Sequence, residues 1–159
     1  MKPEETIDFH IRWLWAKISR LYNAEASKHD GSMSIGYVLL NIDKEGTFST
    51  KLGPKMGMES RSLTRTLKTM EENELIERRT DPDDRRMVRV FLTDKGQAMR
   101  EESKRTVLEL NEHVRNNIDP EKFAVFLDVV KEMNRLVDKP GIFKNRTTHP
   151  THPIPNEKN

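Results

Sequence analysis

The sequence of 159 residues contains no cysteine. This absence excludes disulfide bonds, thiolate metal ligands and redox sensing by a thiol. No apolar stretch approaches the roughly 20 residues that a membrane-spanning helix requires, and the first residues, Met-Lys-Pro-Glu-Glu-Thr, do not resemble a signal peptide. We therefore expect a cytoplasmic protein that has no contact with a membrane. The net charge of +2 is too small to indicate general binding to polyanions.

The sequence also lacks the side-chain arrangements that carry enzyme chemistry. No serine stands in a recognisable nucleophile motif, and no glycine-rich loop is present that could hold a phosphate. The spacing of His149 and His152 is typical of metal ligands, but both lie in a proline-rich tail without a nearby acidic ligand, whereas a metal site needs three or four converging ligands. The sequence therefore predicts no enzyme activity, no cofactor and no metal site.

The most informative stretch, residues 77–96, predicts a β-hairpin followed by a helix. Val88, Val90 and Leu92 alternate with other side chains, which is the period of a half-buried strand. Pro82 fixes its own φ and disfavours a helical conformation at the residue before it, so the chain turns there. Asp83 and Asp84 can stabilise the turn through hydrogen bonds from their side chains to the backbone, and this context favours a structural role over a catalytic carboxylate pair.

This hairpin is basic and follows a basic helix. Five arginines occur within residues 78–89, on a ribbon that we expect to be too small to bury them. A ribbon of this kind fits the edge of a nucleic-acid groove. The preceding helix, expected over 60–73, has its own basic outer face. A helix followed by a basic hairpin is the element order of a winged helix-turn-helix.

The helix expected over 60–73 has two different faces. Leu63, Leu67 and Met70 have the spacing of an apolar stripe and should face the core. The opposite side carries the basic residues Arg61, Arg65 and Lys68. Short hydroxyl side chains border this basic face: Ser60, Ser62 and Thr66. An outer face that is basic over most of its length is less typical of a merely solvated helix, which usually mixes both signs of charge.

Three short elements are expected upstream: a helix over 35–45, a strand over 47–49 and a helix over 50–57. We expect Ser34 to cap the first helix and Gly46 to end it in a left-handed conformation. Pro54 is tolerable in the second helix if it falls in or next to the first turn. Gly53 is expected to allow close packing against the helix 60–73.

Long helices are expected at both ends of the chain, over 6–28, 94–117 and 120–137. Their caps are Thr93 for the second helix and Asp119, followed by proline, for the third. The first helix carries an apolar stripe, with Trp13 and Trp15 adding apolar bulk outside it. This surface exceeds what one monomer can cover, so we expect core packing plus a dimer interface; the alternative is an aromatic wall for a ligand.

Two segments of the hairpin resemble the wing signature of the MarR family of bacterial transcriptional regulators. They are Asp-Pro-Asp-Asp-Arg-Arg at 81–86 and Val-Phe-Leu-Thr-Asp-Lys-Gly at 90–96. Residues 67–79 resemble the end of that family's recognition helix, and the similarity is specific over about 34–96. It implies a mainly α fold with a small β-wing, in which a winged helix-turn-helix is combined with long dimerisation helices. The implied function is that of a homodimeric regulator, a repressor, bound to a pseudo-palindromic duplex DNA.

The resemblance also implies a division of the chain. We expect an N-terminal dimerisation helix in 1–33, the winged helix-turn-helix DNA-binding domain in 34–96, C-terminal dimerisation helices in 97–137 and a mobile proline-rich tail in 138–159. Two other functions stay open: a winged-helix module that binds protein or RNA, and a DNA-binding architectural dimer without an effector.

The predicted DNA contacts divide between the two grooves. Arg61 and Arg65 would enter the major groove, where arginine can bond guanine in a bidentate way. The resemblance implies that Asp84 orients the wing and that Arg86 reaches into the minor groove. The full set of expected DNA-binding residues is Ser60, Arg61, Ser62, Arg65, Thr66, Lys68, Arg78, Asp84, Arg85 and Arg86.

Many MarR-like proteins respond to small aromatic acids bound between the dimer helices and the DNA-binding lobe. The residues expected to line that region here are His10, Trp13, Met33 and Tyr37. Ordinary packing is the alternative interpretation of these four residues.

Overall fold

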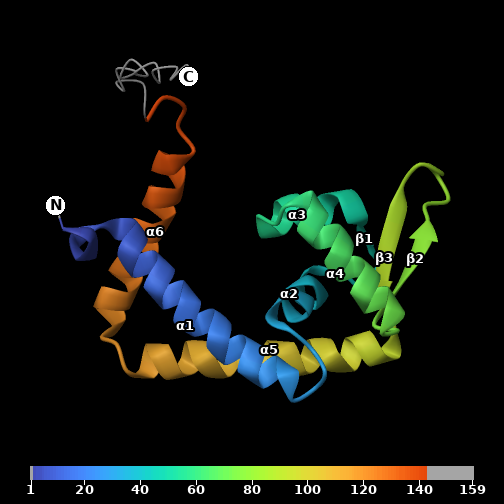
Figure 1. Cartoon of the computed structure of the whole chain (residues 1–159), viewed down its shortest axis with the longest axis horizontal. Helices are drawn as coiled ribbons and strands as arrows, with labels where there is room; N and C mark the ends of the chain where they lie inside the picture. Colours follow the sequence, from blue (N-terminus) through green and yellow to red (C-terminus); the bar gives the residue numbers. More distant parts are fainter. Residues whose placement is uncertain (1, 143–159) are drawn as a thin grey trace, which may run out of the picture. The chain divides into compact units, whose positions relative to one another are not determined.

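The computed structural model describes residues 2–142, which divide into two compact units, 2–113 and 114–142. The larger unit contains a short 3-10 helix η1 (Pro3–Glu5), the helices α1 (Ile7–Ser27), α2 (Met33–Asn41), α3 (Ser49–Met56) and α4 (Ser60–Glu72), and the strands β1 (Thr47–Phe48), β2 (Ile76–Thr80) and β3 (Val88–Leu92). It also contains most of α5 (Asp94–Asn116), whereas α6 (Pro120–Val137) lies in the smaller unit (Figure 1). The predicted mainly α fold with a small β-wing is confirmed. Of the predicted tail, residues 143–159 lie outside the described residues.

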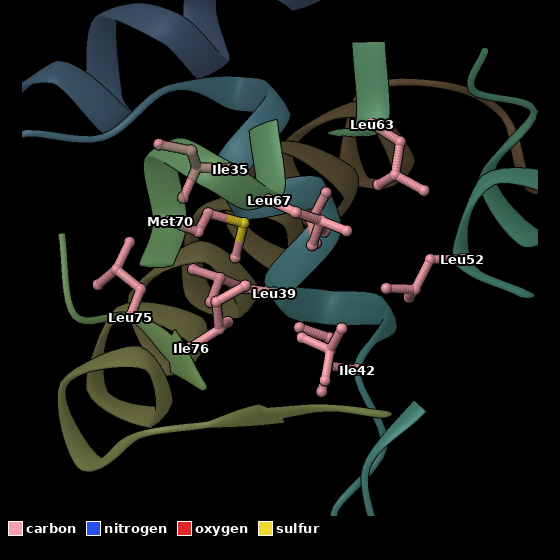
Figure 2. Packing of buried hydrophobic residues seen from close by; sticks show 11 residues of the cluster. Ile35, Leu39, Ile42, Leu52, Leu63, Leu67, Met70, Leu75 and Ile76 are labelled. Atoms are coloured by element: carbon pink, nitrogen blue, oxygen red, sulfur yellow. The ribbon is translucent and has the colours of Figure 1, made fainter. Parts of the chain in front are cut away.

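The core of the larger unit lies where α2, α3 and α4 meet the sheet. Eleven apolar residues form it: Ile35, Val38, Leu39, Ile42, Leu52, Leu63, Leu67, Met70, Leu75, Ile76 and Val90. Leu63, Leu67 and Met70 point from α4 into this core, as their spacing predicts (Figure 2). Truncating one such leucine to alanine costs about 2–5 kcal/mol. The packing therefore fixes which face of α4 stays outside.

The three strands form one antiparallel sheet in the order β1-β3-β2. Thr47 pairs with Val90 on one side of β3, and Arg79 pairs with Arg89 on the other. Strand β1 lies within the strand expected over 47–49 and is the third member of the sheet. Val90 is fully buried at the centre. The β2–β3 hairpin projects from the helices as a narrow ribbon (Figure 1).

Helix α2 differs from its prediction at both ends. It begins at Met33 and is capped by Ser32, whose Oγ accepts a hydrogen bond from the amide of Ile35 at 3.3 Å; Ser34 is not the cap. The helix ends at Asn41, four residues before the predicted end. The physical reason is that Ile42 turns extended and becomes fully buried in the core. Gly46 has a φ of +78°, as predicted, but it lies in the turn before β1 and not at the helix end.

Helix α3 also begins earlier than predicted. Since its first residue is Ser49, Pro54 is in the second turn, where its missing N–H removes one helical hydrogen bond. Pro54 therefore lies outside the first turn but in the turn next to it, the second of the two predicted placements. Gly57 ends the helix with a φ of +61°. A Cβ on Gly53 would lie 3.1 Å from the Met58 carbonyl oxygen and 3.5 Å from Leu63 Cδ2, so the close approach to α4 expected at Gly53 is present.

Four residues, which we call the α4–α5 clamp, join the end of α4 to the start of α5: Glu74, Leu75, Thr93 and Gly96. Thr93 Oγ1 donates to the Glu74 carbonyl at 2.6 Å and accepts from the Gly96 amide at 3.0 Å, so Thr93 caps α5 as predicted. The Thr93 amide donates to the Leu75 carbonyl at 3.2 Å. A Cβ on Gly96 would lie 1.9 Å from the Leu75 oxygen, so only glycine fits there.

In the smaller unit, α6 begins as predicted. The Asp119 side chain accepts hydrogen bonds from the amides of Glu121 and Lys122 at 3.1 and 3.0 Å, and Pro120 occupies the first helical position. No residue of α6 is buried, and the same holds for α1 in the larger unit. Both helices therefore expose large apolar side chains, such as Trp13 and Phe126. Among residues 2–142, no helix is both long and apolar enough to cross a membrane.

Candidate nucleic-acid interface

The outer face of α4 carries three basic side chains, two of which have no acidic partner among residues 2–142. Arg61, Arg65 and Lys68 are exposed on the side away from the core. Within residues 2–142, neither Arg61 nor Arg65 forms an ion pair, whereas Lys68 Nζ lies 3.7 Å from a Glu72 carboxylate oxygen. The first turn of α4 has no acidic residue. This face is therefore positive at the N-terminal end of the helix, where the helix dipole contributes a further partial positive charge.

The hydroxyl residues beside this basic face are partly used by the helix itself. Thr66 Oγ1 donates to the carbonyl of Ser62 at 3.0 Å, so its proton is committed and its oxygen can still accept. Ser60 and Ser62 are exposed. Thr66 is half-buried, which places it at the edge of the face.

The turn of the wing is organised by Asp81, whose role was not predicted from the sequence. Its Oδ1 accepts hydrogen bonds from the amides of Asp83 and Asp84 at 3.0 and 3.1 Å, and its Oδ2 accepts from Arg89 Nε at 2.6 Å. The Arg89 guanidinium, followed by the two amides, lowers the pKa of the Asp81 carboxyl despite its burial. The prediction that Asp83 stabilises the turn with its side chain is wrong. The position of Asp81 directly before Pro82 is the signal that could have identified it.

Asp84 and Arg86 lie beyond this fixed turn. Asp84 Oδ1 accepts from the Arg86 amide at 3.0 Å and from Arg86 Nε at 3.3 Å. The Arg86 side chain is nonetheless 92% exposed. The carboxylate therefore restrains the base of the arginine while its guanidinium remains accessible to a ligand.

The other arginines of the hairpin are held more firmly than the sequence predicted. Arg78 Nε lies 3.3 Å from Glu71, and the side chains of both Arg78 and Arg89 are only 32% exposed. Arg89 also lies over the Phe48 ring at 4.0 Å, and Arg79 over Phe91 at 4.6 Å. None of the five arginines is buried, so the expectation that the ribbon is too small to bury them is confirmed. Arg78 and Arg89 are nevertheless partly covered, because α4 and β1 lie beside them. Arg85 forms no ion pair with any residue of the described chain.

A cavity of about 320 Å³ lies between α1, α2 and α5 of the larger unit. Met33 and Tyr37 line it as predicted, but His10 and Trp13 do not. Trp15 lines the cavity instead, and it is two residues, or about 200° of helix rotation, from Trp13. His10 Nε2 lies 2.8 Å from the Glu4 carbonyl oxygen.

No group of three or more His, Cys, Asp or Glu side chains that could hold a metal ion occurs in residues 2–142. His149 and His152 lie outside the described residues.

Known proteins with a similar sequence or fold include DNA-binding regulators. A sequence model of the MarR family matches residues 38–88, which run from the middle of α2 to the start of β3. A mutant MarR from E. coli, solved in complex with operator DNA, is 26% identical and has a TM-score of 0.70, covering 77% of this chain and 89% of that one. Residues 38–88 of this chain therefore match the MarR family.

Two further proteins define the extent of the similarity. The fold of S. aureus MepR, solved as a DNA complex, matches with a TM-score of 0.77 at 16% identity, over 82% of this chain and 97% of that one. YdgJ of Bacillus subtilis, an uncharacterised HTH-type transcriptional regulator, is 30% identical over 87 residues. That alignment covers 55% of this chain, and the chain spans about half the length of this relative (53%). The name of YdgJ describes a transcription regulator and not an enzyme, in agreement with the function class that the sequence predicts.

Proposed function

We propose that this chain is a homodimeric transcriptional regulator that binds a pseudo-palindromic operator in duplex DNA. The observation that carries the proposal is the pair Arg61 and Arg65, exposed and without ion pairs among residues 2–142, on a helix whose opposite face is packed in the core. Helix α4 enters the major groove, where each arginine can bond guanine O6 and N7. Bound over a promoter, the protein acts as a repressor by occupying the site.

The wing supplies the second contact. Arg86, 92% exposed and restrained by Asp84, enters the adjacent minor groove and responds to its width and potential. Arg78, Arg85 and Lys68 contact phosphates, which position the protein without specifying sequence. Ser60, Ser62 and Thr66 add short contacts at the edge of α4.

The dimer is formed by the terminal helices. Residues 34–96 constitute the DNA-binding part, and residues 1–33 and 97–137 the dimerisation parts. The support is the exposed apolar surface: Ile11 and Leu14 on α1 are 50% and 51% exposed, and Val125 and Leu136 on α6 are 62% and 49% exposed. Patches of this kind mark protein interfaces. Light scattering at micromolar concentration should give twice the 18.6 kDa mass of the chain; a stable monomer would refute this part of the proposal.

A small aromatic ligand that binds the cavity would release the DNA. Two observations support this regulation: α5 contributes Met99, Ser103 and Val107 to the cavity wall, and the α4–α5 clamp attaches the start of the same helix to the end of α4. A ligand that shifts α5 would therefore move the recognition helix. By thermodynamic reciprocity, DNA must weaken the binding of that ligand by the same factor.

The two alternative functions differ from the proposed one in the partner that is bound or in the response to a ligand. A winged-helix module for RNA or protein would not prefer a duplex sequence, and an architectural dimer would bind DNA without responding to any ligand. The exposed α4 arginines favour duplex DNA, because the major groove accommodates a helix.

Selection of bound sequences from a random duplex pool tests the proposed function. We expect an enriched pseudo-palindrome whose half-sites are one helical turn apart, roughly 34–36 Å. The affinity for that duplex should fall steeply with salt. An unenriched pool, with equal binding to half-sites and full palindromes, would contradict the proposal.

A further inference from the structure

The cavity between α1, α2 and α5 is lined by aromatic rings and by carboxylates. Trp15, Tyr22 and Tyr37 supply the rings, and Glu25 and Glu102 the negative charges. Pockets near this size, about 300 Å³, are at the lower limit of those that hold small organic ligands. The cavity therefore suits a compact ring compound, and its charged groups decide which charge that compound carries.

The charges around the cavity do not suit an acid. No lysine or arginine is among its lining residues, and His29 is the one lining side chain that can gain a positive charge. Lys28 pairs with Glu25 at 2.6 Å, and Arg105 pairs with Glu102, but neither cation lines the cavity. An aromatic carboxylate would thus meet two like charges in the cavity wall, whereas neither of their counterions lines the cavity.

The start of α2, which borders the cavity, would ordinarily attract an anion because helix N-termini present free amides. Here the protein already uses two of those donors. The Met33 amide donates to Asn23 Oδ1 at 3.0 Å, and the Ile35 amide donates to Ser32 Oγ at 3.3 Å. Two amides of the helix end are therefore occupied by oxygens of the chain itself.

The hydroxyl groups of the α5 wall are engaged in the same way. Ser103 Oγ donates to the Met99 carbonyl at 2.9 Å, and Thr106 Oγ1 donates to the Glu102 carbonyl at 3.0 Å. What these groups retain is acceptor capacity. A ligand that donates hydrogen bonds satisfies them, whereas a carboxylate ligand does not.

We propose that the cavity binds an aromatic organic cation, a ring carrying a primary amine or amidine, in preference to an aromatic acid. The rings of Trp15, Tyr22 and Tyr37 offer cation–π contact, and Glu25 and Glu102 offer charge-assisted hydrogen bonds. The regulatory meaning of this binding rests on the proposed function, but the binding itself does not. This preference departs from the aromatic acid that the family resemblance implies.

Three naphthalene probes of matched shape test the charge preference on the full-length chain without DNA. They are 2-(aminomethyl)naphthalene, 2-naphthalenemethanol and 2-naphthoate, measured by calorimetry and by tryptophan fluorescence. We expect the amine to bind most tightly, the alcohol next and the carboxylate most weakly. Tighter binding of the carboxylate, or no binding of any probe at millimolar concentration, would overturn the proposal. Because DNA is absent, this failure is distinct from a failure of operator binding.

Variants assign the preference to the two carboxylates. Glu25→Gln and Glu102→Gln should each lower the affinity for the amine probe by about two- to fivefold, the range of partly exposed ion pairs. The affinity for the alcohol probe should not change. Glu101→Gln is the matched control, since Glu101 neighbours Glu102 on α5 without lining the cavity. The ratio of amine to alcohol affinity is the readout, so a loss of folded protein does not imitate the effect. Equal weakening of all three probes, or a loss of naphthoate binding in His29→Gln beside an unaffected amine, would refute the assignment.

Discussion

The arginines of the recognition helix and those of the wing have the same chemistry but different surroundings. Arg61 and Arg65 are exposed on α4 and have no ion-pair partner in residues 2–142. In the hairpin, Arg89 is bound by Asp81 at 2.6 Å and covered by the Phe48 ring. A guanidinium already desolvated and paired has little capacity left for a phosphate or a base. Basic residues near a groove therefore divide into those that hold the wing in place and those that are available to DNA.

Removal of the two exposed α4 arginines, Arg61 and Arg65, should weaken DNA binding more than any other change in this series. The double variant Arg61→Ala with Arg65→Ala is expected to weaken binding to the selected duplex by about 2–6 kcal/mol, from about 1–3 kcal/mol for each base contact. Stability to urea should change by less than about 0.5 kcal/mol, because neither side chain packs in the core. Lys104→Ala on α5 is the matched loss of an exposed positive charge and should leave sequence preference intact. An unfolded double variant would show that these two arginines are needed for the fold, which would contradict their assignment as side chains available to DNA.

Arg86 should follow, because it belongs to the wing but remains exposed. Arg86→Ala is expected to weaken specific binding by about 1–3 kcal/mol, the scale of one groove contact, without loss of fold. Fluorescence anisotropy on the selected duplex measures the affinity. Asp84→Asn, which removes the charge that restrains Arg86, should give a smaller loss. Full affinity of Arg86→Ala, with the dimer intact, would exclude this arginine from the interface.

Asp81 tests whether Arg89 has a structural role in the wing, because its carboxylate is the ion-pair partner of Arg89. Asp81→Ala leaves Arg89 Nε and two amides without their acceptor, so Tm should fall by about 2–8 °C, the shift expected for losing one such contact. Because the folded-state pKa of Asp81 is lowered, its contribution to stability is complete above the unfolded value of 3.8 and is lost as pH falls through the folded value. Calorimetry at neutral and acid pH measures both effects. An identical acid dependence of Tm in Asp81→Ala and the parent chain would contradict this role.

Arg79 should show the smallest effect of the series. Its side chain is 60% exposed, pairs with the neighbouring Glu77 and lies over the Phe91 ring. Exposed ion pairs contribute about 0–1 kcal/mol, so Arg79→Gln should change both stability and DNA affinity by no more than that. A loss comparable to that of Arg86→Ala would show that ion pairing does not separate the two classes of arginine.

The sequence predicted the parts of this fold that depend on local pattern. The stripe of Leu63, Leu67 and Met70 defines the buried face of α4 by helical period alone, and Asp119 with Pro120 defines the start of α6 by capping chemistry. The end of α2 could not be found in this way. Its position depends on the burial of Ile42 in a core made by distant elements.

The candidate site could also be predicted only where a local motif identifies its residues. The wing motif located Asp84 and Arg86, but the pairing of Asp81 with Arg89 joins residues eight positions apart across a turn, and periodicity does not show it. Choosing between Trp13 and Trp15 requires knowing which side of α1 faces α2 and α5. The sequence leaves both possible, because apolar residues occur on several sides of that helix.

The most direct test compares Arg61→Ala with Arg89→Ala on the same selected duplex, with affinity measured by anisotropy and stability by urea unfolding. We predict that Arg61→Ala weakens binding by about 1–3 kcal/mol and leaves the urea midpoint unchanged. Arg89→Ala should lower the midpoint and, where folded, weaken binding less than Arg61→Ala does. Parental affinity in Arg61→Ala, or a loss of affinity in Arg89→Ala that exceeds it at full stability, would contradict the account.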